Sequence, residues 1–252
     1  MKKSVLWMVG LLLFASGTGI ADHADAEDSL VIATTSWTAA FARAAGLTNI
    51  RVLAPYELQH PAEYELKPSD IVAVTRATRI IYAGYEIMVE RIAGAVGSEQ
   101  DKLVQITTDH RMETIRQSVR KIARATGTEE QAEKNLREIG SFFDGWKREI
   151  AVGASVLVHF FQRPLAEELG FEIAGVFGPA PLEARQIAEL SSKNPELIID
   201  NRHNPIGSPL KETLPGVSYV LFINFPGSEE EGSLLDVLRS NRGALRQAFS
   251  GG

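Results

Sequence analysis

The sequence contains no cysteine, and this absence excludes several kinds of protein site. Disulfide scaffolds, thiolate metal sites and thiol nucleophiles are all ruled out, so His, Asp and Glu are the only strong metal ligands available. Basic residues are not in surplus either, since 26 Lys and Arg stand against 32 Asp and Glu, for a net charge of -6. A chain without a basic surplus does not favour nucleic acid as a partner.

The chain also lacks a long, uncharged apolar segment beyond its N-terminus. Lys2 and Lys3 precede a short apolar run over residues 5–14, and residues 24–26 (Ala-Asp-Ala) match a signal-peptidase cleavage site. The run is shorter than the roughly 20 residues that a membrane span needs. We therefore predict a signal peptide over residues 1–26. Because no cysteine follows it to accept a lipid, we expect a free periplasmic protein.

The remaining composition is that of an ordinary globular protein. Of the 252 residues, 44% are hydrophobic and 23% are charged, which suits one large domain or two lobes. From residue 30 onward, short β-rich runs alternate with helical stretches, a pattern typical of an α/β fold. The strand candidates are 31–35, 50–53, 79–83, 155–158, 196–199 and 219–223. These runs form two series, so we predict α/β lobes over residues 27–110 and 151–252.

Residues 111–150 separate the two series, and their pattern is helical. The apolar residues that recur at helical spacing are Ile115, Val119, Ile122, Ala123, Leu136, Ile139, Phe142 and Phe143. Residues 126–130 (Thr-Gly-Thr-Glu-Glu) can interrupt this region as a turn followed by a new N-cap. One long linking helix and a bent pair of helices both remain open.

Polar residues end several of the apolar runs. His159, Asp200 and Asn224 close three of them, and His60 lies in the loop after residues 50–53. In open α/β sheets, ligands bind beyond the carboxyl ends of the strands. His203 follows Asp200 and leaves the same strand end. Imidazole and carboxylate groups suit a borderline divalent ion such as Zn²⁺.

Several segments resemble the zinc and manganese substrate-binding proteins of ABC importers. Residues 60–71 (HPAEYELKPSDI), together with 79–84 (RIIYAG), look like the first signature of that family. Residues 159–171 (HFFQRPLAEELGF) are similar to the segment in which a ligand histidine leads into a helix. Residues 195–200 resemble the strand that ends in a ligand carboxylate. The likeness covers nearly the whole mature chain.

The resemblance implies two lobes joined by a long backbone helix, with a metal captured between them for a membrane permease. Ala62 stands where the family places a histidine, so His60 or Glu63 takes that role. We expect the metal ligands to come from His60, His159, Asp200 and His203. His110 and Asn224 are further candidates. If Asp200 does not bind the metal, it can accept the second ring N–H of a ligating histidine.

The sequence therefore predicts a monomeric, periplasmic substrate-binding protein that delivers a divalent metal to an ABC importer. Zn²⁺ is the expected cargo and Mn²⁺ the alternative; no chemistry is performed on it, so we do not expect an enzyme. Two other functions remain open. One is a secreted metallohydrolase in which Glu63 acts as the base. The other is a receptor of similar fold for a metal chelate or an organic ligand.

Overall fold

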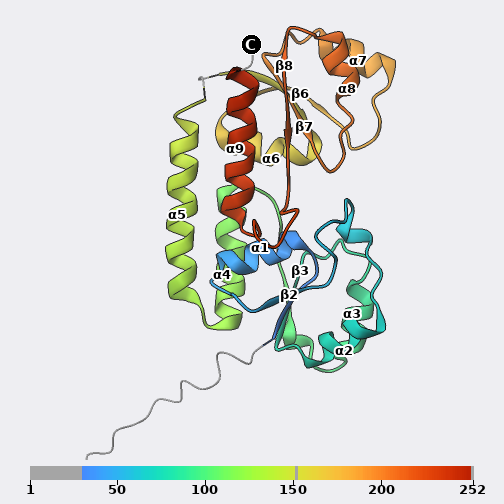
Figure 1. The fold of residues 1–252 in the computed structure, drawn as a ribbon, viewed down its shortest axis with the longest axis vertical. Helices are drawn as coiled ribbons and strands as arrows, with labels where there is room; N and C mark the ends of the chain where they lie inside the picture. Colours follow the sequence, from blue (N-terminus) through green and yellow to red (C-terminus); the bar gives the residue numbers. More distant parts are fainter. Residues whose placement is uncertain (1–29, 151–152, 251–252) are drawn as a thin grey trace, which may run out of the picture.

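The computed structural model of this protein describes residues 30–150 and 153–250. The predicted signal peptide, residues 1–26, lies outside the described residues. Two parallel four-stranded sheets, each with helices on both faces, form two lobes (Figure 1). The predicted two-lobe α/β fold is confirmed. Across 30–150 and 153–250, none of the helices combines the length and the apolar character needed to cross a membrane.

The N-terminal lobe is built on a sheet with the strand order β2-β1-β3-β4, all parallel. Its strands are β1 (Val31–Ala33), β2 (Ile50–Val52), β3 (Arg79–Tyr82) and β4 (Leu103–Gln105). Its helices are α1 (Ser36–Ala44), α2 (Pro68–Arg76) and α3 (Val89–Val96), with 3-10 turns η1 (Pro61–Glu63) and η2 (Gln100–Lys102). Helix α1 packs on one face of the sheet, and α2 and α3 pack on the other.

The C-terminal lobe repeats this topology, with the strand order β6-β5-β7-β8. Its strands are β5 (Ser155–His159), β6 (Glu172–Phe177), β7 (Leu197–Asn201) and β8 (Ser218–Phe222). Its helices are α6 (Arg163–Leu169), α7 (Ala184–Ser191), α8 (Ser208–Thr213) and α9 (Leu234–Ser250), with the 3-10 turn η3 (Phe160–Gln162). In both sheets the strand order reverses beside the first strand, and such switch points are where ligands bind.

The linking region forms a pair of helices, α4 (Met112–Thr126) and α5 (Glu129–Lys147), so the bent arrangement is the one observed. The chain turns between them at Gly127, whose φ of 71° lies in the left-handed region that ends helices. Helix α5 contacts α1 of the N-terminal lobe and α6 of the C-terminal lobe, so it spans both lobes (Figure 1).

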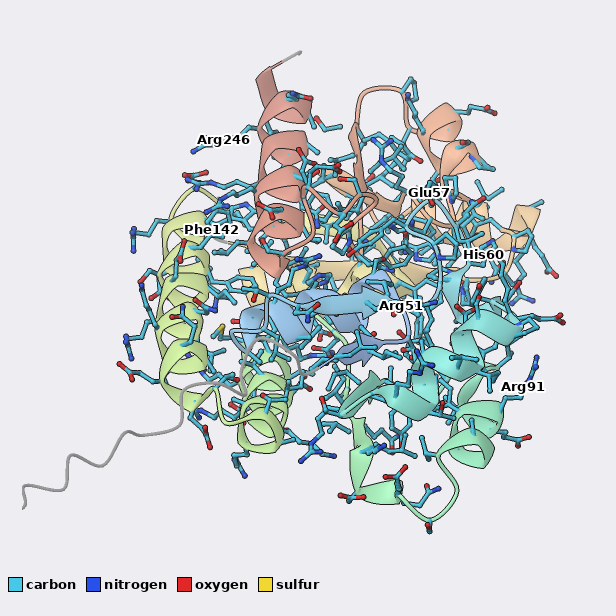
Figure 2. The ribbon with its side chains drawn as sticks, turned by 60° about the horizontal axis from the view of Figure 1, so that its bottom comes forward. Arg51, Glu57, His60, Arg91, Phe142 and Arg246 are labelled. Atoms are coloured by element: carbon cyan, nitrogen blue, oxygen red, sulfur yellow. The ribbon has the colours of Figure 1, made fainter. Side chains whose placement is uncertain are left out.

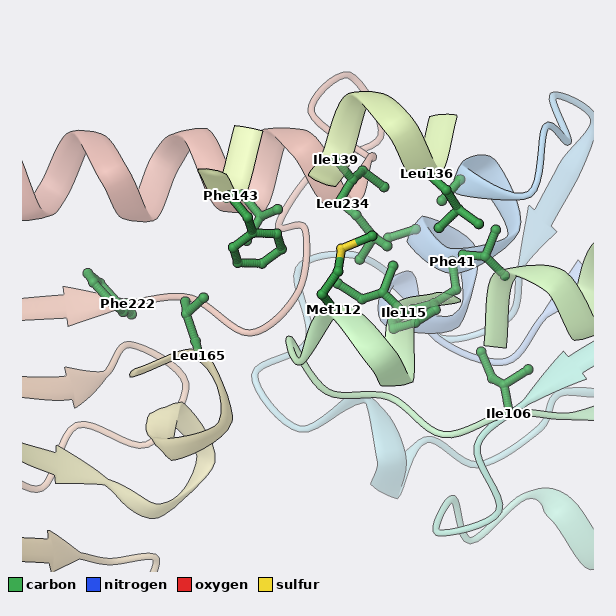
Figure 3. Packing of buried hydrophobic residues seen from close by; sticks show 14 of the residues in the cluster. Phe41, Ile106, Met112, Ile115, Leu136, Ile139, Phe143, Leu165, Phe222 and Leu234 are labelled. Atoms are coloured by element: carbon green, nitrogen blue, oxygen red, sulfur yellow. The ribbon is translucent and has the colours of Figure 1, made fainter. Parts of the chain in front are cut away.

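A single hydrophobic core joins the two lobes on the side of α5 and α9. Figure 3 shows side chains from α1, α4 and α5 packed together with Leu234 at the start of α9. The same cluster continues through Phe143 and Trp146 to Phe222 of β8. The rings of Trp146 and Phe222 lie 6.2 Å apart, between centroids. This shared core fixes how the two sheets face each other.

Candidate ligand cleft between the lobes

A cleft of about 630 Å³ lies where loops of the two sheets face each other. Its lining comes from loops that follow the strands of both sheets, as the topology requires. From the N-terminal lobe these are Thr35 and Trp37 after β1, residues 59–63 after β2, and Tyr85 after β3. From the C-terminal lobe they are residues 160–161 after β5, Asn201, His203 and Asn204 at and after β7, and residues 224–225 after β8.

His60 and His203 approach this cleft from opposite lobes. His60 is exposed and precedes turn η1 of the N-terminal lobe (Figure 2). The side-chain amide of its neighbour Gln59 donates a 3.1 Å hydrogen bond to the backbone oxygen of His203, which ties the two loops together. Two imidazoles from separate lobes therefore line one space.

The ring of His203 is held in place and uncharged at neutral pH. It stacks on Phe225 with the ring centroids 3.8 Å apart. Burial is the main cause that lowers the pKa of His203 to about 4, and the nearby positive charges of Arg202 and His60 lower it as well. Its Nε2 is buried and has no hydrogen-bond partner among the described residues. A neutral imidazole with a free nitrogen is a competent metal ligand.

Asp200 does not line the cleft; instead it anchors the loop that carries His203. One carboxylate oxygen accepts the backbone N–H of Asn201 at 2.7 Å. The other accepts the backbone N–H of Gly207 at 2.7 Å and the hydroxyl of Tyr219 at 2.6 Å. Asn201 in turn accepts the backbone N–H of His203 at 2.8 Å. Asp200 thus fixes both ends of this loop.

His159 is fully buried inside the C-terminal lobe and is not part of the cleft lining. Its Nδ1 accepts the backbone N–H of Phe161 at 3.1 Å, and its ring packs against Phe161 and Phe177. Burial lowers the pKa of His159. A Cβ at Gly178 would lie 2.7 Å from its Nε2, so the backbone closes over this ring. Phe161, which lines the cleft, covers His159.

The four expected ligands are therefore not brought together in this structure. His60 and His203 line the cleft, whereas His159 and Asp200 lie behind it with hydrogen bonds that serve the local fold. Glu63 also lines the cleft. Within residues 30–150 and 153–250, His, Asp and Glu form no group of three or more that is close enough to hold an ion.

A stack of rings crosses from one lobe to the other at the base of these loops. Trp37 of α1 lies 5.7 Å from the ring of His110 and 6.1 Å from that of Phe225, between centroids. Phe225 stacks on His203 in turn. His110 is buried under Trp37, and this burial lowers its pKa to about 4. Its Nε2 lacks a hydrogen-bond partner within the described part of the chain.

The aromatic character of the cleft was not expected from the sequence. Tyr85, Phe160 and Phe161 line it, and these side chains are 53%, 51% and 42% exposed. Phe160 follows His159 directly, and Phe225 follows Asn224, so both adjoin strand-end residues that were singled out as candidates. Attention to the residues after each strand end, as well as to the polar ones, would have found them.

The charged groups of the cleft are mixed. Glu63, Asp109, Arg111 and Arg163 all contribute to the lining. Arg111 forms an ion pair with Asp109 at 2.9 Å. The guanidinium groups of Arg111 and Arg163 both form ion pairs with Glu167 of α6. These pairs hold the pKa of Arg111 above and that of Glu167 below its usual range, chiefly through the hydrogen bond between them. The walls therefore combine two anionic and two cationic side chains around the aromatic surface.

Comparisons with known proteins give the fold a clear counterpart. No protein-family model matches the sequence, and neither does any curated protein. Among solved structures, the Mn-bound periplasmic metal-binding protein of Candidatus Liberibacter asiaticus is 15% identical, covering 86% of this chain and 98% of that chain with a TM-score of 0.61.

The Cd-bound form of the Liberibacter protein is 16% identical, over 86% of this chain and 98% of that chain, with a TM-score of 0.62. The metal-dependent lipoprotein YcdH of Bacillus subtilis is 18% identical, covering 87% of this chain and 98% of that chain, with a TM-score of 0.64. The chain therefore has the two-lobe fold of these proteins.

Proposed function

We propose that this protein is a periplasmic substrate-binding protein that captures a divalent transition metal between its two lobes. The cargo is delivered, unchanged, to the permease of an ABC importer, and the protein acts as a monomer. Zinc is the proposed metal and manganese the alternative. The similar two-lobe structures, whose names describe metal-binding periplasmic proteins and a metal-dependent lipoprotein, support this direction.

The observation that carries the proposal is the pair of imidazoles, His60 and His203, that line one cleft from opposite lobes. The buried Nε2 of His203 has no hydrogen-bond partner among the described residues, and an unpaired buried nitrogen of this kind has a free energy cost that a metal would relieve. Imidazole suits zinc, copper, iron and nickel better than it suits manganese, which prefers oxygen ligands. Zinc therefore fits this pair better than manganese does.

In this proposal, Asp200 and His159 serve the site without contacting the ion. Asp200 holds the loop that carries His203 through the backbone of Asn201 and Gly207. His159 positions the start of η3 through Phe161. Both are positioning residues, which differs from the four-ligand set that the sequence suggested.

The direct test is metal binding to the mature chain and its variants. Elemental analysis after desalting, together with calorimetric titration with Zn²⁺, should give one ion per chain. His60→Ala and His203→Ala should each weaken binding by at least about tenfold, which corresponds to about 1.4 kcal/mol. Glu57→Ala is the matched control, because Glu57 lies in the same loop as His60 but does not line the cleft (Figure 2).

The outcome that contradicts the proposal is equally clear. A chain that binds none of zinc, manganese, iron and nickel would not be a metal receptor. Binding that survives both histidine substitutions would show that the ion sits elsewhere.

A further inference from the structure

The cleft offers fewer protein ligands than a bare ion requires. Zn²⁺ in proteins is almost always held by four ligands in structural sites, and Ca²⁺ and Mg²⁺ take more. His60 and His203 contribute two, and the described residues hold no group of three His, Asp or Glu side chains. An ion bound by this pair therefore keeps coordination positions that the two imidazoles leave open for an incoming ligand.

The cleft is also too large for an ion and its remaining waters. Its volume of about 630 Å³ corresponds to roughly 20 water molecules at about 30 Å³ each. Sites of several hundred Å³ with mainly apolar and aromatic walls are typical of organic ligands. The space therefore matches a ligand that is much larger than a metal ion.

The exposed aromatic rings of the walls also favour an organic ligand. Tyr85, Phe160 and Phe161 present half-exposed faces to the cleft, and Trp37 and Phe225 add two more rings. A hydrated ion gains nothing from such surfaces. An organic molecule that covers them removes apolar area from water and stacks on the rings.

The charged side chains of the cleft also favour a chelated metal over a bare ion. Arg111 and Arg163 line the wall beside Glu63 and Asp109, so the cleft has no surplus of carboxylates to attract a bare dication. Guanidinium groups repel such an ion, whereas they bind carboxylates through paired hydrogen bonds. A metal that arrives already bound by a carboxylate-bearing molecule fits both the imidazoles and the arginines.

We infer that the cargo enters this cleft as a metal chelate, in which a small organic molecule with carboxylate groups fills the coordination positions that His60 and His203 leave open. This inference rests on the proposed function and specifies the form of its substrate. The imidazoles bind the metal, Arg163 binds a carboxylate of the chelator, and the aromatic rings cover its carbon skeleton.

The test compares three nickel species by calorimetric titration of the mature protein. Aqueous Ni²⁺ offers metal alone, Ni²⁺-nitrilotriacetate leaves positions open for two imidazoles, and Ni²⁺-EDTA leaves none. Ni²⁺-nitrilotriacetate should bind at least about tenfold more tightly than aqueous Ni²⁺. Native mass spectrometry should then show protein, nickel and nitrilotriacetate in one complex.

Variants separate the two parts of the recognition. His203→Ala should weaken the binding of both aqueous Ni²⁺ and the chelate. Arg163→Gln should weaken the binding of the chelate several-fold without weakening that of aqueous Ni²⁺, because it removes a guanidinium that repels the bare ion. Arg163 is exposed and pairs with Glu167 of its own helix α6, so the fold should tolerate the change. Arg185→Gln, on the exposed surface of α7 outside the cleft, is the matched control and should change neither.

The possible failures are distinguishable. If aqueous Ni²⁺ binds as tightly as the chelate and is recovered without nitrilotriacetate, the chelate inference fails but metal capture stands. If Ni²⁺-EDTA binds as well as Ni²⁺-nitrilotriacetate, the imidazoles do not coordinate the metal of the chelate, and the inference fails. If zinc, manganese, iron and all three nickel species fail to bind, the proposed function itself fails.

Discussion

Replacing Asp200 with Asn separates its structural role from that of a metal ligand. The carboxylate is fully buried and accepts three hydrogen bonds, from the backbone of Asn201 and Gly207 and from the hydroxyl of Tyr219. In Asp200→Asn, an NH₂ group replaces one of the two carboxylate oxygens, and each of them accepts one backbone N–H, from Asn201 or from Gly207. The tyrosine hydroxyl can turn and accept a hydrogen bond, but a backbone N–H cannot.

The expected loss of stability follows from the number of hydrogen bonds that Asp200→Asn breaks. One buried donor left without an acceptor costs about 1–3 kcal/mol, and the charge-assisted character of the remaining bonds is also lost. We therefore expect the free energy of unfolding of the metal-free protein to fall by about 2–4 kcal/mol, measured by urea denaturation. Tyr219→Phe removes a single donor and should cost about 1 kcal/mol.

The opposite result would refute this reasoning. If Asp200→Asn leaves the metal-free protein as stable as the wild type but abolishes metal binding, then Asp200 is a ligand and not an anchor. A stable variant that keeps normal affinity would show that the hydrogen bonds to Asn201 and Gly207 carry no net stabilisation.

Three further predictions concern other parts of the molecule. Burial lowers the pKa of His110 to about 4, below the value of about 6.5 for a histidine of an unfolded chain. Between these two pH values the histidine is protonated in the unfolded state and neutral in the folded state. The free energy of unfolding should therefore fall by up to about 3 kcal/mol as the pH drops through this range. Urea titrations at several pH values should show a smaller fall in His110→Asn. Gly178→Ala combines a φ of 79° with a 2.7 Å approach of the new Cβ to His159 and should lower the melting temperature more than Gly127→Ala, where the φ is also positive but nothing lies within 4 Å; equal losses would disprove the close approach. Ligand binding should change the tryptophan fluorescence through Trp37, which lines the cleft, and not through the buried Trp146; Trp37→Phe should remove the change, and a change that persists would place the ligand elsewhere.

The fold was largely predictable because hydrophobic patterning specifies buried parallel strands. The apolar runs at 31–35, 79–83 and 155–158 coincide with β1, β3 and β5, which lie at the centres of their sheets. The strands that escaped prediction are edge strands, β4 and β6. β4 buries only its middle residue, Val104, and β6 is half-exposed and contains Gly175, so neither shows a buried apolar run.

The helical spacing of Ile115, Val119 and Ile122 likewise matches a buried face of α4. The turn at Gly127 was one of two open alternatives, because a short turn signal does not determine whether a helix bends or continues. The left-handed conformation that Gly127 adopts is one that glycine takes readily.

The site was only partly predictable. Ligands bind beyond the carboxyl ends of the strands, which indicates where the residues of the site lie along the chain but not which way their side chains point. His159 does stand at the carboxyl end of β5, but its ring turns into the lobe toward Phe177 rather than into the cleft. Asp200 belongs to β7, and its carboxylate accepts hydrogen bonds from the backbone of the loop that follows. His203, which lies past the strand end, reaches the cleft. Side-chain direction at a strand end depends on packing between distant segments, which a single sequence does not reveal.

The central claim is that imidazoles of the two lobes meet at one metal. A crystal structure of the loaded mature protein, with anomalous data collected at the absorption edge of the metal, tests it most directly. We predict one peak in the cleft, with a ring nitrogen of His60 and the Nε2 of His203 both at about 2.0–2.1 Å from it, as for zinc bound by imidazole. A peak bound through one lobe alone, or a cleft with no metal while His60 and His203 remain apart, would contradict it.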